Sequence, residues 1–287
     1  MKVEWILKFV WDEFIYGGHL LSLGAVSIVF TSALLLGIPV GWDFLMIVYL
    51  ITYIIYLYDR FRGLEQDSST NYDRSRHIKK YVKYIPIIIS SSILIIIGIL
   101  FYFGNWSSLV FGLLLLLFGL FYNSFFKKLT QKIVGFKNFY VAFEWALLVV
   151  FLAFYYSFPL DLAVLLLFIF IFLRWLINTI FFDIKDIKSD KEHNLGTIPV
   201  SYGKNKTLNY LHIINIFSFV LVIIGVYKNI LPVSFLSLSI FYFYSFFYIQ
   251  KAKNKSVNIN SLSYIMVDGE YLFWSIVLFL SNIIVYG

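Results

Sequence analysis

The stretch "LAVLLLFIFIFLRWLINTIFFDIKDIKSD", residues 162–190, joins a long apolar run to a polar segment that contains three aspartates. A helix of ~20 apolar residues crosses a bilayer, so this run predicts a transmembrane helix. Asp183, Asp186 and Asp190 follow at intervals of three and four, which predicts that they share one face of a helix continuing out of the membrane. Because neighbouring like charges repel, we expect a cation to accompany the three acids.

The composition of the whole chain agrees with a membrane location. Of its 287 residues, 61% are hydrophobic and 14% are charged, whereas about a quarter of the residues of a soluble domain are charged. Nine apolar runs are long enough to cross a bilayer; they cover 19–36, 41–58, 84–103, 106–122, 138–157, 160–182, 208–226, 229–249 and 268–286. The sequence therefore predicts an all-α polytopic membrane protein, a bundle of nine transmembrane helices with a polar cap on its cytoplasmic side.

The first 18 residues differ from the rest. They alternate apolar and charged side chains at helical spacing, which predicts an amphipathic segment lying along the membrane surface; an extension of the first span is the alternative. Residues 19–287 form, in this interpretation, a single nine-helix transmembrane domain. The first span lacks a small-residue cleavage site, so it does not resemble a signal peptide. The chain contains no cysteine, which excludes disulfides and thiolate sites.

The distribution of the basic residues predicts how the chain is oriented in the membrane. The N-terminus and the connections after every second span hold 21 of the 23 Lys and Arg residues, and the opposite connections hold only Lys228. Positive charge collects on the cytoplasmic side of membrane proteins. We therefore expect a multi-pass protein of the cell membrane with a cytoplasmic N-terminus and an external C-terminus. This asymmetry also accounts for the net charge of +7 without a nucleic-acid partner.

A second acidic segment is predicted on the same side. At the cytoplasmic end of the second span the sequence reads "YLYDRFRGLEQDSSTNYDRSRH", residues 56–77, with acids that include Asp59 and Asp67. Carboxylate ligands without Cys or His suit Mg²⁺ better than zinc, and the interleaved Arg and Lys suit a phosphate-bearing ligand. The sequence thus predicts Mg²⁺ and a diphosphate. For either segment alone, ordinary solvated interfacial charge is an equal alternative.

The two segments resemble the aspartate-rich motifs of the UbiA superfamily of intramembrane prenyltransferases, whose members have nine transmembrane helices and carry these motifs after helices 2 and 6. The second motif is matched by Asp183, Lys185, Asp186 and Asp190, followed by "NLGTIPVSYGK". The resemblance covers most of the chain in its pattern of spans and about 40 residues in its motifs.

The first motif departs from the family pattern of Asn-x-x-x-Asp-x-x-x-Asp. When its last acid is set on Asp67, Arg76 falls on an expected arginine, Gly63 on the expected middle acid and Asp59 on the expected Asn. One expected carboxylate is missing at Gly63 and an acid replaces an amide at Asp59, so the total number of acids is kept. The departure leaves open a divergent member that binds a prenyl lipid without turning it over.

The resemblance implies an enzyme that transfers an isoprenyl group from a prenyl diphosphate to a hydrophobic aromatic or lipid acceptor, assisted by Mg²⁺. It implies catalytic metal ligands and substrate-binding residues. The expected ligands are Asp59, Asp67, Asp183, Asp186 and Asp190. The expected contacts to substrate are Arg76, Lys127, Lys185 and Asn178. The residues select neither the acceptor nor the length of the prenyl chain.

Two other membrane classes compete with this interpretation. An ion-coupled carrier places ionisable groups near the bilayer midplane, and Glu144 and Arg174 lie inside predicted spans, where an ionisable residue is a functional candidate by default. The acidic segments, by contrast, both lie at one interface. A CDP-alcohol phosphotransferase requires an Asp-Gly-x-x-Ala-Arg run that this chain lacks.

Overall fold

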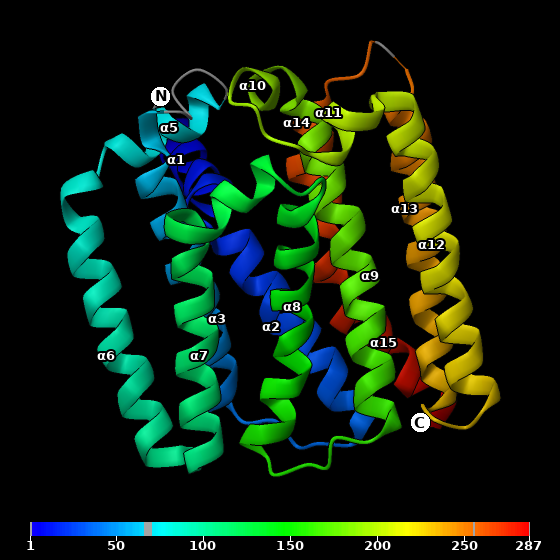
Figure 1. The fold of residues 1–287 in the computed structure, drawn as a ribbon. Helices are drawn as coiled ribbons and strands as arrows, with labels where there is room; N and C mark the ends of the chain where they lie inside the picture. The colour runs from blue at the N-terminus through cyan, green and yellow to red at the C-terminus, as the bar shows by residue number, and fades with distance from the viewer. Residues whose placement is uncertain (1, 66–70, 255, 287) are drawn as a thin grey trace.

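The computed structural model describes residues 2–65, 71–254 and 256–286, with the side chains of 2–5, 123–128 and 286 left out. All regular structure in these ranges is helical, and the long helices run side by side as a bundle (Figure 1). These are α2 (His19–Leu36), α3 (Trp42–Arg62), α6 (Ile85–Phe103), α7 (Trp106–Phe125), α8 (Phe136–Tyr155), α9 (Leu162–Lys185), α12 (Lys204–Tyr227), α13 (Ile240–Ala252) and α15 (Leu272–Tyr286).

The described residues contain eight helical segments that are long and apolar enough to cross a membrane. The predicted span 106–122 falls within α7, which packs between α3 and α8, but its apolar part, Trp106–Tyr122, is shorter than the other eight. The predicted count of nine is therefore not confirmed, although the all-helical polytopic fold is. Predicted and observed boundaries agree within a few residues for most spans, and α2 matches 19–36 at both ends.

The remaining α-helices, most of them short, gather at one end of the bundle. They are α1 (Lys2–Tyr16), α5 (Tyr72–Lys79), α10 (Ile187–Glu192), α11 (Ile198–Tyr202) and α14 (Ile259–Ser261). The N-terminus lies at this end and the C-terminus at the other (Figure 1). The segments that carry the two acidic motifs therefore end on the same side of the bundle.

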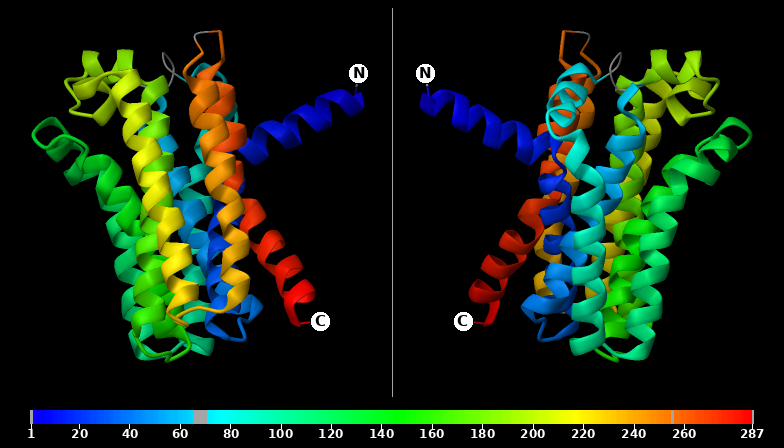
Figure 2. Two further views of the ribbon diagram at one scale, coloured as in Figure 1. Left: turned by 90° about the vertical axis from the view of Figure 1, so that its right-hand side faces the viewer. Right: turned by 90° about the vertical axis from the view of Figure 1, so that its left-hand side faces the viewer.

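Helix α1 projects sideways from the bundle instead of continuing α2 (Figure 2). The change of direction occurs at Gly17 and Gly18, and Gly18 has φ of +106°, which favours glycine. A Cβ at Gly18 would also lie 2.9 Å from Arg60 Nη1. Because α1 exposes Leu7 and Trp11, its apolar surface is suited to the headgroup boundary of a bilayer.

The core is centred on α9, which packs against α8 and α12. Arg174 of α9 is only 2% exposed, and its guanidinium donates to the carboxylate of Glu270 and to Asn215 Oδ1. A buried charge is tolerated when it is paired and hydrogen-bonded in this way. Arg174 therefore links α9 to α12 and to the segment before α15. It does not line the cavity described below.

Candidate active site

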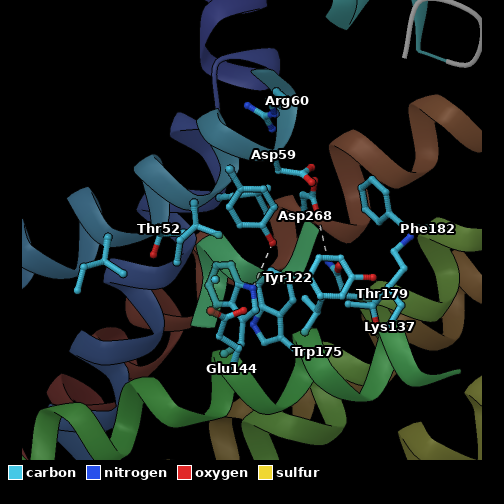
Figure 3. A pocket seen from close by; sticks show the side chains of 18 of the residues that line it. Thr52, Asp59, Arg60, Tyr122, Lys137, Glu144, Trp175, Thr179, Phe182 and Asp268 are labelled. Atoms are coloured by element: carbon cyan, nitrogen blue, oxygen red, sulfur yellow. Dashed lines mark hydrogen bonds between the residues drawn. The ribbon is translucent and has the colours of Figure 1, made fainter. Parts of the chain in front are cut away.

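A cavity of about 240 Å³ lies among α3, α7, α8 and α9, with further lining from α5 and from the segment before α15. Figure 3 shows Asp59 and Asp268 next to each other below Arg60, and Glu144 beside Trp175 at the far end of the labelled side chains. The charged lining residues are Asp59, Arg60, Arg74, Lys137, Glu144, Lys185, Asp186 and Asp268. The cavity thus has a polar end beside the short helices and a less polar interior.

The second motif does not continue as one helix. Helix α9 ends at Lys185, Asp186 adopts φ of −99° and ψ of 5°, and α10 begins at Ile187. The break interrupts the single continuous helix that the spacing of Asp183, Asp186 and Asp190 predicted. Of the three, only Asp186 lines the cavity. Lys185, which also lines the cavity, donates to Asp186 Oδ2 at 2.9 Å.

Asp183 is completely buried and does not line the cavity. Its Oδ1 accepts a hydrogen bond from Lys137 Nζ at 2.7 Å, and its Oδ2 accepts one from Asn138 Nδ2 at 2.7 Å. Both donors stand on the first turn of α8. Lys137 itself lines the cavity, so Asp183 holds a cation at the cavity wall. The sequence reasoning did not single out Lys137, since a lysine at a helix end usually serves topology.

Asp190 lies in α10 and is 5% exposed. Burial raises the pKa of its carboxyl to about 6, against the opposing charge of Lys137. Oδ2 of Asp190 is enclosed and has no hydrogen-bond partner among the described residues. The chain then returns to the bundle through Gly196, whose N–H donates to Thr130 O at 2.8 Å. Asp190 therefore stands beside the polar end of the bundle without lining the cavity.

The first motif contributes Asp59, which lines the cavity from α3. Gly63 follows one turn later as the cap of α3, where its N–H donates to Asp59 O at 2.9 Å. Arg76 is exposed and does not line the cavity, whereas Arg74 of the same helix does. Asp67 and the side chain of Lys127 lie outside the described residues.

Asn178 lines the cavity and donates to Asp268 Oδ1 at 3.0 Å. Asp268 comes from the segment that precedes α15, and Figure 3 shows it next to Asp59. This acid is the first residue of the predicted span 268–286, and the sequence alone assigned it no role. An ionisable residue at the start of an apolar span was the available signal.

The inner wall of the cavity is aromatic. The rings of Trp145 and Trp175 stack with centroids 3.5 Å apart, and Trp145 Nε1 donates to Tyr56 Oη at 3.2 Å. All three line the cavity, together with Tyr122 and Phe182. Such π faces can stabilise a cation that lies against them.

The residues at the polar end fit Mg²⁺ by their chemistry. Over the described part of the chain, no three side chains of His, Asp or Glu stand close enough together to form a metal cage. Mg²⁺ does not need one, because it keeps several waters and is held by one or two carboxylates together with substrate phosphates. Asp59 and Asp186 offer such carboxylates from two helices to one cavity.

Residues 82–279, more than half of the chain, match the UbiA prenyltransferase family. The chain belongs to this family. No curated protein matches it in sequence. The match confirms the resemblance read from the motifs and the multi-pass membrane class.

Solved structures share the fold. A UbiA homologue from Aeropyrum pernix K1 superimposes with a TM-score of 0.72 at 15% identity, over 92% of this chain and 97% of the homologue. A UbiA homologue from Archaeoglobus fulgidus, bound to DMAPP and Mg²⁺, gives 0.65 at 11% identity over 93% and 98%. A structure of digeranylgeranylglyceryl phosphate synthase gives 0.61 at 14% identity over 97% of each chain.

Proposed function

We propose that this member of the UbiA family transfers an isoprenyl group from a prenyl diphosphate to a hydrophobic acceptor, with Mg²⁺ bound at the polar end of the cavity. The observation that carries the proposal is one cavity that brings a group of charged side chains from the helix ends together with a set of aromatic side chains. A diphosphate requires the first and an allylic chain the second. The Archaeoglobus fulgidus homologue binds DMAPP or GPP together with Mg²⁺, which supports the same pairing of ligands here.

At the polar end, Asp59 and Asp186 would hold Mg²⁺, and Lys137, Lys185 and Arg74 would contact the diphosphate. When bound, Mg²⁺ would supply positive charge against the charge that develops on the leaving diphosphate. Lys137 is suited to its role because Asp183 fixes its ammonium group at the wall. Lys185 also donates to Asn71 Oδ1 at 3.0 Å, which links the segments of the two motifs.

In the interior, the aromatic side chains would receive the allylic carbon. Departure of the diphosphate leaves positive character on this carbon, and the rings of Trp145 and Tyr56 provide negative π faces. Trp175 supports Trp145 from behind, because its own ring is stacked between those of Trp145 and Tyr271. The bulk of these rings also excludes water, which would otherwise capture the carbon and give simple hydrolysis. The allylic carbon would then form its new bond with the acceptor.

We propose more limited roles for the other site residues that were predicted from the sequence. Asp183 acts through Lys137, and Asn178 acts by holding Asp268. Asp190, with its unpartnered oxygen, remains a candidate ligand for a second metal ion, and Asp67, Arg76 and Lys127 keep the roles that the family resemblance implies. Since 21 of the 23 basic residues belong to the N-terminus and to connections on its side, we infer that the polar end faces the cytoplasm.

The test measures by calorimetry how geranyl diphosphate (GPP) binds to the purified full-length chain in detergent, first with Mg²⁺ and then with EDTA. We expect binding that requires Mg²⁺ and that falls at least tenfold in Asp186→Asn and in Asp59→Asn. Asp73→Asn is the matched control, because Asp73 is an exposed acid at the same end of the bundle that does not line the cavity. Binding by the wild type that ignores EDTA would contradict the metal assignment.

Two further measurements on the same purified protein distinguish prenyl transfer from binding without turnover and from ion-coupled transport. Mg²⁺-dependent binding with no product from any acceptor, detected by mass spectrometry, would identify a divergent member that binds without turnover. Absence of GPP binding, combined with ion-driven uptake into proteoliposomes, would favour the carrier instead.

A further inference from the structure

Glu144 lies in the interior of the cavity, away from the residues assigned to the diphosphate. It stands on α8 seven residues after Lys137, which is ~10 Å along a helix. Figure 3 places it at the opposite end of the labelled set from Asp59 and Arg60. Apolar side chains line the cavity beside the aromatic ones: Ile55 from α3, Leu115 from α7, and Val141 and Leu148 from α8.

One oxygen of the Glu144 carboxyl group has no partner among the described residues. This oxygen, Oε1, is enclosed. An unpartnered polar group in an apolar environment destabilises a fold, so its presence on a cavity wall points to a partner that the protein does not itself supply. Arg174, also within a span, contrasts with it by having Glu270 and Asn215 as partners.

The packing of α7 leaves room for this carboxyl. A Cβ built on Gly119 would lie 2.7 Å from Glu144 Oε1 and 2.3 Å from Ile55 Cδ1. Any larger residue at Gly119 would therefore have to displace the carboxyl, the Ile55 side chain or the helix. The small residue thus keeps Glu144 turned into the space between α3, α7 and α8.

The charge around the cavity restricts what Glu144 can bind. The described basic residues of the wall are Arg60, Arg74, Lys137 and Lys185. All four belong to the polar end, at helix termini or in the short helix α5. An anionic ligand group beside Glu144 would therefore be buried in this part of the cavity with no cation to neutralise it. A hydroxyl or N–H group would instead give the carboxyl its missing hydrogen bond.

We propose that Glu144 recognises the acceptor: it accepts a hydrogen bond from a hydroxyl or N–H group of an uncharged acceptor and discriminates against acceptors that carry a carboxylate there. This inference rests on the proposed prenyl transfer, because that function gives the cavity two substrates. The donor occupies the polar end, and Glu144 marks the place of the second substrate.

The experiment uses three matched probes, 2-naphthol, naphthalene and 2-naphthoate, which differ in one substituent. Their affinities are measured by calorimetry on the full-length protein saturated with Mg²⁺ and an unreactive thio analogue of geranyl diphosphate. We expect 2-naphthol to bind about tenfold or more tighter than naphthalene, as for a hydrogen bond to a carboxylate, and 2-naphthoate to bind most weakly. Affinity ratios are compared between variants, so that partition into detergent cancels.

The variants distinguish the effect of the hydrogen bond on affinity from the effect of the cavity's shape. Glu144→Leu should abolish the preference for 2-naphthol over naphthalene, and Glu144→Gln should keep part of it and relax the exclusion of 2-naphthoate. Gly119→Ala should reduce the preference with Glu144 intact. Thr52→Val is the control, since Thr52 lines the same cavity but its hydroxyl donates within its own helix, to Val48 O at 2.9 Å; it should behave as the wild type.

Binding of the thio analogue with Mg²⁺ reports separately on the proposed function and on folding. If it is intact in Glu144→Leu and 2-naphthol is still preferred, Glu144 is not the recognition residue. A wild type without any preference for 2-naphthol overturns the proposal as well. If the wild type fails to bind the analogue, prenyl transfer is contradicted; a hydroxyl preference still lost in Glu144→Leu would then place Glu144 in a lipid-binding cavity without catalysis.

Discussion

Lys137 Nζ lies 2.7 Å from Asp183 Oδ1, and this contact joins the first turn of α8 to the last turn of α9. Asp183 is completely buried, while Lys137 reaches the cavity wall. An acid of the second aspartate motif therefore acts here on a protein cation. The motif contributes to the cavity through Asp186 directly and through the position of Lys137.

The first prediction concerns this pair. Lys137→Met leaves the carboxylate of Asp183 buried with only Asn138 as a partner. Leaving this buried carboxylate without its cation is expected to destabilise the protein by no more than about 3–5 kcal/mol, the loss found for fully buried pairs. We also expect weaker binding of GPP with Mg²⁺, because the variant removes a cation from the polar end. Thermal unfolding in detergent and calorimetry measure the two effects.

The double variant Lys137→Met/Asp183→Leu is the control. Replacing both partners by apolar groups removes the buried charge, so the unfolding temperature should recover. GPP affinity should stay low if Lys137 contacts the diphosphate. Wild-type affinity in a stable double variant would mean that the pair only holds α8 against α9.

The fold could be predicted largely from hydropathy, because a bilayer requires long apolar helices whatever their packing. The boundaries of α2 and α9 were close to the predicted ones. The spacing of Asp183, Asp186 and Asp190 predicted one continuous helix, and this part of the prediction was wrong. Helix continuity depends on contacts that the sequence does not display, and here α9 ends one residue before Asp186.

The candidate site was predictable only where its residues lie in the two motifs. Asp59, Asp186, Lys185 and Asn178 all line the cavity. Asp268 does so as well, but it follows Asp59 by about 200 residues and only the packing of the helices brings the two together. Glu144 was noticed for its place inside a span, whereas the missing partner of its carboxyl oxygen could be known only from the structure.

The second prediction concerns the core. Arg174→Met would leave the carboxylate of Glu270 buried without its guanidinium partner, and about 3–5 kcal/mol of stability should be lost. Neither residue lines the cavity. The unfolding temperature should therefore fall while the folded protein binds GPP with unchanged affinity. A loss of GPP affinity in folded protein would show that the network also shapes the cavity.

The third prediction is a pH dependence of the metal-free protein. Asp190 has a folded pKa of about 6, raised by burial from 3.8. Folding therefore favours the protonated acid, so the stability that this group contributes is fully present below pH 3.8 and is lost as the pH rises through 6. Measured in EDTA, the stability of the wild type relative to Asp190→Asn should fall by on the order of 1–3 kcal/mol between pH 4 and 7. A constant difference would rule out the raised pKa.

The last prediction tests the departure in the first motif. Gly63 caps α3 with φ of −89° and ψ of 3°, a conformation open to residues other than glycine. It lies one turn beyond Asp59, so Gly63→Asp adds a carboxylate near the polar end where the family pattern has one. More carboxylate ligands bind a hard divalent cation more tightly, and we expect the Mg²⁺ concentration for half-maximal GPP binding to fall several-fold. Gly63→Asn, of the same size and without charge, should leave it unchanged. If the two variants behave alike, the missing acid plays no part in holding the metal, and Asp59 and Asp186 suffice.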